Sequence, residues 1–197
     1  MFEHPVAQWG FTLVFVLLLG YSAVRAFVDR AKPVQTIGHA LHGVMAADMA
    51  MMSWPWWMDL PGSPQTLFFS VATLWFLGMF VLQAGGRLPR RIFGGHGAAH
   101  QAAHVAMMLA MVWMVVVMSG SQPSQGGHDH GSMSVLAALT GVVVVVALLV
   151  SGVIFVVEFA DCVRGAGKAW LGHTGDMASG AVMCLSMAAM CLPMLVQ

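Results

Sequence analysis

Residues 95–119 read GHGAAHQAAHVAMMLAMVWMVVVMS, with histidines in the first half and methionines in the second half. At about 100° per residue in an α-helix, both sets of side chains fall on one face, in a sector roughly 80° wide. The residues of that face are His96, His100, His104, Met107, Met111, Met114 and Met118. The other positions are largely apolar, and the segment exceeds the about 20 residues that cross a bilayer. The stretch therefore predicts a membrane helix with imidazoles at one end and thioethers at the other.

The composition of the whole chain is typical of a membrane protein. Of its 197 residues, 59% are hydrophobic and 8% are charged, whereas soluble domains carry about 25% charged residues. We expect an all-α fold. The chain is predicted to form a single transmembrane domain over residues 1–197 with six membrane helices. The predicted helices cover residues 8–28, 36–57, 65–85, 96–118, 133–159 and 173–196. The chain is predicted to be a multi-pass protein of the plasma membrane, surrounded by the lipid bilayer.

The basic residues indicate how the chain is oriented. All eight lie at the first, third and fifth connections: Arg25, Arg30, Lys32, Arg87, Arg90, Arg91, Arg164 and Lys168. The connections 58–64 and 119–132 contain none. Because basic loops of membrane proteins remain in the cytoplasm, the N- and C-termini are predicted to lie outside. The eight basic and eight acidic residues balance, and no basic tail or groove indicates nucleic-acid binding.

Two other predicted helices repeat the methionine pattern. Each of the three follows a basic connection, begins near a Gly-His pair and carries methionines in steps of four and three residues. The stripes are Met45, Met49 and Met52; Met107, Met111, Met114 and Met118; and Met183, Met187, Met190 and Met194. We interpret the pattern as three repeated helical hairpins, about 1–58, 59–120 and 121–197. Because all hairpins insert in the same direction, the stripes are expected to lie at similar depths, with Trp56 beside their outermost layer.

The stripes predict a site for a soft metal ion. If the three helices meet at a common axis, the methionines form layers of three thioethers, and thioether sulfur favours Cu(I). Several equivalent sites in series permit an ion to move between them. Towards the cytoplasmic side, imidazoles and carboxylates replace the thioethers. These further candidate ligands are His39, His42, Asp48, His100, His104, His173 and Asp176.

The ionisable residues of these helices also need an explanation. Such groups are costly inside a bilayer and indicate a functional site. Asp48 and Asp176 are expected to hold the second nitrogen of a histidine ligand. A purely structural interpretation is that methionines fill gaps between helices and that buried histidines are hydrogen-bonded core residues. The repetition on three helices favours metal binding over this interpretation.

Two resemblances follow from these motifs. The segments HALHGVMAADMAMM (39–52) and HQAAHVAMMLAM (100–111) resemble an uncharacterised actinobacterial integral-membrane family, a domain of unknown function with five to six helices. That resemblance implies no activity. The three Met-x-x-x-Met motifs that begin at Met45, Met107 and Met183 look like those of the Ctr copper transporters, trimers whose stacked methionine triads line a pore. The six expected helices and the intramembrane histidines depart from the Ctr pattern and favour a bound metal centre as a rival to open conduction.

One function is predicted, and two alternatives stay open beside it. The prediction is an integral membrane Cu(I)-binding protein that takes up copper through the methionine layers. The ion would reach the intramembrane His/Asp site and pass to a cytoplasmic copper carrier. In the first alternative, the His/Asp cluster holds copper or iron in a membrane redox enzyme. In the second, histidines of helices 36–57 and 96–118 hold haem b.

Overall fold

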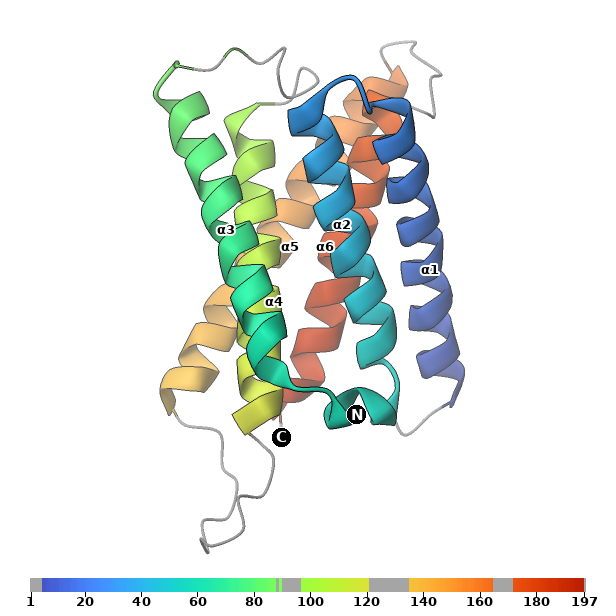
Figure 1. The fold of residues 1–197 in the computed structure, drawn as a ribbon, viewed down its shortest axis with the longest axis vertical. Helices are drawn as coiled ribbons and strands as arrows, with labels where there is room; N and C mark the ends of the chain where they lie inside the picture. Colours follow the sequence, from blue (N-terminus) through green and yellow to red (C-terminus); the bar gives the residue numbers. More distant parts are fainter. Residues whose placement is uncertain (1–4, 88, 90–96, 121–134, 165–171, 197) are drawn as a thin grey trace, which may run out of the picture.

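The computed structural model describes residues 5–87, 89, 97–120, 135–164 and 172–196. His96, at the start of the quoted stretch, lies outside these residues. The elements are α1 (Pro5–Val28), α2 (Pro33–Met52), the short 3-10 helix η1 (Pro55–Asp59), α3 (Gly62–Ala84), α4 (Ala98–Gly120), α5 (Val135–Arg164) and α6 (His173–Val196). The prediction of an all-α fold is confirmed, and the six long helices form one bundle (Figure 1).

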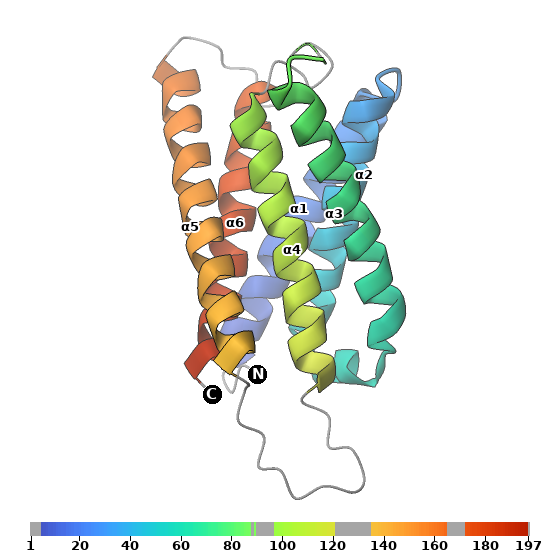
Figure 2. The same ribbon diagram turned by 90° about the vertical axis from the view of Figure 1, so that its left-hand side faces the viewer.

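The helices pack as three antiparallel pairs. The largest contacts join α1 with α2, α3 with α4, and α5 with α6, as expected of three hairpins. The second and third pairs also meet along α4 and α5, whereas the first pair contacts the third through a smaller interface between α1 and α6. Figure 2 shows the same bundle from the side, with the helices running close to one common direction. As a result α2, α4 and α6 all run in the same sense.

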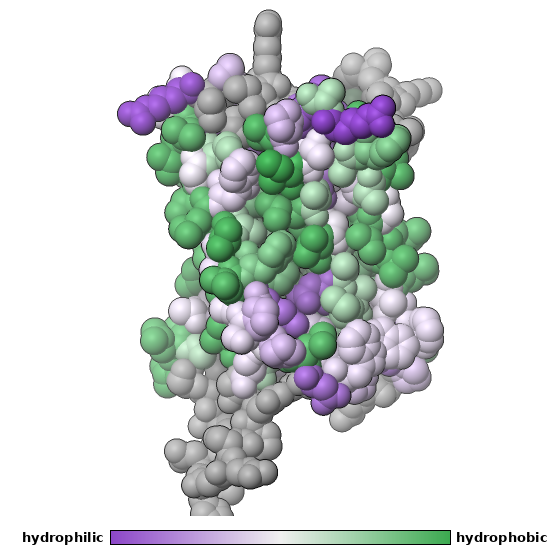
Figure 3. Space-filling model, in the orientation of Figure 1, coloured by the Kyte–Doolittle hydropathy of each residue, from purple (hydrophilic) through white to green (hydrophobic). Residues whose placement is uncertain are grey.

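Five of the described helices, α1, α3, α4, α5 and α6, are long and apolar enough to cross a membrane. The remaining long helix, α2, has 20 residues but is not apolar enough, because it carries His39, His42 and Asp48. It nevertheless runs beside α1 along the bundle (Figure 1). Figure 3 shows apolar surface over the middle of the molecule and hydrophilic side chains near its ends. The described part of the chain therefore has the helices of a multi-pass membrane protein, with five of them long and apolar enough to span a bilayer.

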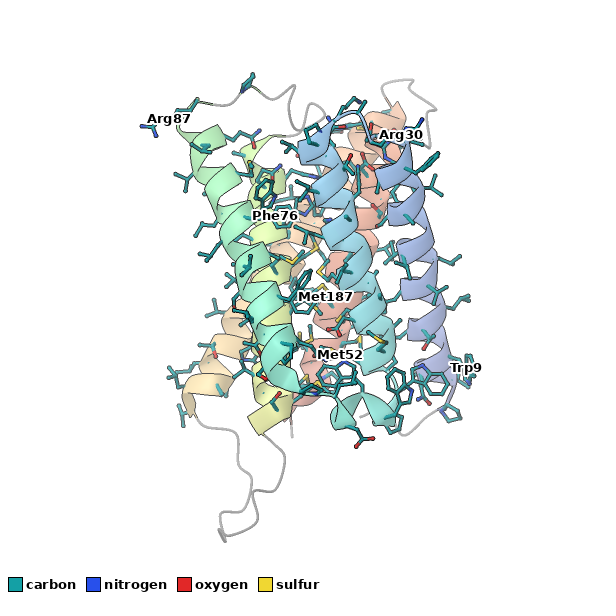
Figure 4. The ribbon with its side chains drawn as sticks, viewed as in Figure 1. Trp9, Arg30, Met52, Phe76, Arg87 and Met187 are labelled. Atoms are coloured by element: carbon teal, nitrogen blue, oxygen red, sulfur yellow. The ribbon has the colours of Figure 1, made fainter. Side chains whose placement is uncertain are left out.

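The two ends of the bundle differ in composition. Arg30 and Arg87 lie at one end and Trp9 lies at the other (Figure 4). We call these the basic end and the tryptophan end. Helix α1 begins and helix α6 ends at the tryptophan end, so the first and last helix ends lie on the same side (Figure 1). That this side faces outwards remains a prediction of the positive-inside rule.

The predicted helix 36–57 is wrong at its outer end. Helix α2 ends at Met52, and the chain turns into η1. Pro55 causes the break, because proline has no N–H group and disfavours helical backbone at the preceding residue. Trp54 accordingly has extended backbone, with φ −111° and ψ 142°. The side chain expected beside the outermost methionine layer, Trp56, is 49% exposed, and Trp57 is buried in its place.

The interior of the bundle is built mainly from the methionine-bearing helices. Half of the spanning segment of α4 and 44% of that of α6 are buried, against 22–28% for α1, α3 and α5. The exposed side chains of α1 and α5 are largely valine, leucine and aromatic residues, which suit contact with lipid. The plain helices thus form the outside of the bundle and position the methionine stripes inside it.

Candidate functional site

Methionines from three helices form one buried core. Eight of the candidate ligands are at most 1% exposed: Met45, Met49, Met52, Met107, Met111, Met114, Met183 and Met187. All eight belong to the same cluster of contacting buried residues. Figure 4 shows sulfur atoms in the interior between the helices, with Met52 and Met187 labelled. We call these eight residues the methionine core.

The stripe methionines nearest the tryptophan end of α4 and α6 are more exposed than the methionine core. Met118 and Met190 are 7% and 8% exposed, and Met194 is half-buried. Two methionines outside the stripes, Met108 and Met177, are in contrast fully buried. The sequence gives no periodic signal for these two, because each lies off the shared face of its helix.

Three histidines meet at the side of the methionine core that faces the basic end. The imidazole ring centroids of His42 and His104 are 4.5 Å apart, and those of His100 and His104 are 4.3 Å apart. His100 and His104 are each 7% exposed. His42 Nδ1 lies 3.3 Å from the carbonyl oxygen of Gly38. We call these three residues the histidine cluster; it joins α2 to α4.

Aromatic rings surround the histidine cluster. Phe155 of α5 lies edge-on to His100, with ring centroids 5.1 Å apart. Phe76 of α3 lies 5.0 Å from His104, again between centroids. Counting along the three stripes puts Gly180 at the depth of His42 and His104, and its missing side chain leaves the space that the Phe155 ring occupies. The third place beside the two imidazoles is therefore filled by an aromatic ring.

Asp176 belongs to a buried ion-pair network. Arg25 donates hydrogen bonds from Nε and Nη2 to the two carboxylate oxygens of Asp176, each at 3.0 Å. Tyr21 donates a third hydrogen bond to Asp176 Oδ1 at 2.8 Å. Arg25 also pairs with Asp29 at 2.9 Å. From the sequence, Arg25 is only a basic residue flanking the first helix; its four-residue spacing from Tyr21 is the signal that both lie on one face.

The remaining predicted histidine ligands, His39 and His173, line the same cavity as the ion-pair network. His39 Nε2 lies 3.6 Å from Asp29 Oδ2, and Lys32 Nζ lies 3.1 Å from Asp29 Oδ1. His173 is the first residue of α6 and its side chain is exposed. These residues surround the histidine cluster on its basic side without entering the methionine core.

A cavity of about 300 Å³ connects the histidine cluster with the ion-pair network. Its size is at the lower end of the about 300–1,000 Å³ that is usual for ligand sites. Its polar lining consists of Ser22, Arg25, Asp29, Lys32, Gln35, His39, His42, His100, Gln101, His104, His173, Asp176 and Ser179. Five of the predicted histidine ligands and Asp176 thus share one cavity at the basic end.

Asp48 does not hold a histidine, contrary to the sequence prediction. It lies six residues from His42 along α2, about 1.7 turns or about 9 Å at 1.5 Å per residue. Its Oδ1 atom accepts a hydrogen bond of 3.2 Å from Trp57 Nε1. The side chain is 5% exposed, and along α2 it lies between Met45 and Met52 of the methionine core.

The described residues contain no group of three or more His, Cys, Asp or Glu side chains placed to hold a metal ion. The histidines therefore have to be considered together with the thioethers beside them. Met45 and Met107 each follow a clustered histidine by three residues, His42 and His104 respectively. Residues at this spacing are neighbours on a helix. On both α2 and α4 the imidazoles are thus followed, towards the tryptophan end, by thioethers.

These features define a class: a multi-pass helical membrane protein with methionines, histidines and a buried ion pair in its interior. The chain belongs to the family described as a domain of unknown function, DUF5134, which matches residues 34–194. The uncharacterized proteins Rv0970 and MT0998 of Mycobacterium tuberculosis and Mb0995 of Mycobacterium bovis are similar to it. Each is 31% identical over 97 residues, 49% of this chain and 46% of the relative.

The mycobacterial relatives agree with the resemblance to an uncharacterised actinobacterial family. This chain spans about half the length of the curated relatives it matches. No solved structure matches it. The likeness to Ctr copper transporters is not supported by the family or these relatives and stays confined to the short methionine motifs.

Proposed function

We propose that the protein is an integral membrane Cu(I)-binding protein of the plasma membrane. The observation that carries the proposal is the methionine core itself, eight thioethers from three helices, each at most 1% exposed. Thioethers are neutral, soft ligands that need not lose a proton to bind, and they favour Cu(I) over hard ions. The histidine cluster adjoins this core and adds imidazole nitrogen, which also binds copper. The two ligand types together offer a continuous set of soft and intermediate donors.

The proposed direction of movement is from the tryptophan end to the basic end. Met52 and Met45 are seven residues apart, so the core spans about 10 Å along α2. An ion could pass between neighbouring sets of thioethers, because conduction requires sites that bind without trapping. The cavity at the basic end then receives the ion through the histidine cluster. A cytoplasmic copper carrier is the partner proposed to collect it there.

The geometry favours Cu(I) over the two alternatives. The ring centroids of His42 and His104 are 4.5 Å apart and the rings are in edge contact. A haem held between α2 and α4 therefore requires these rings to separate and admit a porphyrin. A redox enzyme built on the histidines gives no role to the buried thioethers. Copper(I) binding uses both groups.

Cu(I) competition with a coloured chelator tests the proposal. Purified protein in detergent is titrated under reducing, oxygen-free conditions. The test variant replaces Met45, Met107 and Met183 by leucine, and we expect roughly tenfold or greater loss of affinity, about 1.4 kcal/mol or more. Such near-isosteric replacements usually cost less than about 1.5 kcal/mol each in stability.

Met108→Leu is the matched control. Met107 and Met108 are adjacent on α4 and both are fully buried, but only Met107 lies on the stripe. We expect Met108→Leu to bind Cu(I) like the wild type. Equal affinity of the wild type and the triple variant would contradict the proposal. The same proteins in liposomes, assayed for copper uptake, distinguish transport from binding alone.

A further inference from the structure

Asp48 is a buried acidic residue without a basic partner among the described residues. Its side chain is 5% exposed, and its Oδ2 atom is buried and has no hydrogen-bond partner in the described part of the chain. The other oxygen, Oδ1, accepts the hydrogen bond from Trp57. Asp29 and Asp176, in contrast, both pair with Arg25.

The distribution of charge explains the isolation of Asp48. The Lys and Arg side chains of the described residues lie at or near the basic-side ends of the helices, and Asp48 lies in the opposite half of α2. Asp59, the other acidic residue described near the tryptophan end, is exposed. A carboxylate buried inside a membrane protein without a partner is strongly unfavourable. A cation that comes from outside the chain would remove this cost.

The surroundings of Asp48 indicate the kind of cation. Met45 precedes it by three residues and Met52 follows it by four, so both are its neighbours on the helix. Both thioethers are at most 1% exposed. Thioethers carry no charge, so a monovalent ion held only by sulfur would stay uncompensated in a low-dielectric interior. Asp48 supplies the missing negative charge beside soft ligands.

We propose that Asp48, Met45 and Met52 form an outer cation site for soft monovalent ions on the α2 side of the methionine core, farther from the basic end than the histidine cluster. In this site the negative charge of the carboxylate at Oδ2 attracts the cation, and the sulfur atoms of Met45 and Met52 bind it. Trp57 is a positioning residue: its indole holds Oδ1, and its ring is 3% exposed. The inference rests on the proposed function, and it assigns to α2 a site separate from the histidine cluster.

Asp48→Asn tests the site because it removes the charge and keeps the shape. Cu(I) and Ag(I) are each titrated into wild type, Asp48→Asn and Asp48→Glu in detergent. We expect Asp48→Asn to bind both ions roughly tenfold or more weakly, since opposite charges at contact distance attract strongly even at an effective dielectric constant near 20. Asp48→Glu keeps the charge and is expected to retain most of the affinity.

Thermal unfolding of the metal-free proteins separates this role from a structural one. Removing an unpartnered buried charge is expected to leave Tm unchanged or to raise it, although affinity falls. A lower Tm of Asp48→Asn with unchanged affinity of the folded protein would assign Asp48 a structural role and overturn the inference. Trp57→Phe retains the charge and loses the N–H donor; we expect a smaller, about two- to fivefold, loss of affinity by weaker positioning.

The results also separate the inference from the proposed function. If the wild type binds neither Cu(I) nor Ag(I), the proposed function itself is wrong. If the wild type binds both ions and Asp48→Asn binds them equally well, only the outer cation site is wrong.

Discussion

The ring of Phe155 lies against the backbone of Gly180, in the place that a side chain at position 180 would need. A Cβ atom built on Gly180 would lie 3.0–3.1 Å from three carbon atoms of that ring. Phe155 in turn contacts the imidazole of His100 edge-on. A residue without a side chain on α6 thus lets an aromatic residue of α5 reach the histidine cluster.

Gly180→Ala is predicted to destabilise the protein. Few Cβ contacts in proteins are as short as 3.0–3.1 Å, so the Phe155 ring has to move. Overpacking of this kind costs about 1–3 kcal/mol. Thermal unfolding in detergent measures the effect, and Phe155→Leu in the same chain should restore part of the lost stability. An unchanged Tm of Gly180→Ala would show that the ring moves freely.

Arg25→Gln is predicted to be strongly destabilising. Arg25 is 8% exposed and pairs with both Asp29 and Asp176, so its removal takes away the guanidinium that these two buried carboxylates share. Breaking one partner of a buried ion pair costs about 3–5 kcal/mol. Arg164→Gln is the control, because the Arg164–Asp161 pair is 3.9 Å long and largely exposed. Equal Tm values for the two variants would contradict the assigned role of the network.

Gly141→Ala is predicted to disturb the packing of α4, α5 and α6. An added Cβ would collide with the side chains of Trp113 and Leu195. Trp113 cannot easily move away, because its Nε1 donates a 3.1 Å hydrogen bond to the carbonyl oxygen of Ala137. We expect a loss of about 1–3 kcal/mol in unfolding experiments. Gly78→Ala, at a position with open space around it, should leave stability nearly unchanged.

The orientation in the membrane can be measured with reporters fused to the C-terminus. Because α6 ends at the tryptophan end and the basic residues lie opposite, the positive-inside rule predicts an active alkaline phosphatase fusion and a dark fluorescent-protein fusion. The reverse pattern would place the histidine cavity on the outer side. Copper would then have to move outwards in the proposed function.

Much of the fold follows from periodicity in the sequence. The three methionine stripes predicted which faces of α2, α4 and α6 lie inside, and the stripe positions from Met45 to Met187 are buried. Apolar length alone predicted α1, α3 and α5. The predicted helix 36–57 runs five residues past the observed end of α2 at Met52, although Pro55 indicates a break.

The site was less predictable because its contacts join distant parts of the chain. Arg25 and Asp176 are 151 residues apart, and their ion pair leaves no mark in the spacing of either helix. Phe155 reaches the histidines only because Gly180 lacks a side chain. Trp57 binds Asp48 only after Pro55 turns the chain back. Helical faces can be deduced from spacing, whereas contacts between helices depend on how the faces dock.

X-ray absorption spectroscopy at the copper edge tests the central claim most directly. The protein is loaded with Cu(I) under reducing conditions, and the spectrum identifies the atoms bound to the metal. We predict a first shell dominated by sulfur, with a nitrogen contribution that decreases when His42 and His104 are both replaced by alanine. A first shell of nitrogen and oxygen without sulfur would contradict the account, because the buried thioethers would then have no part in binding.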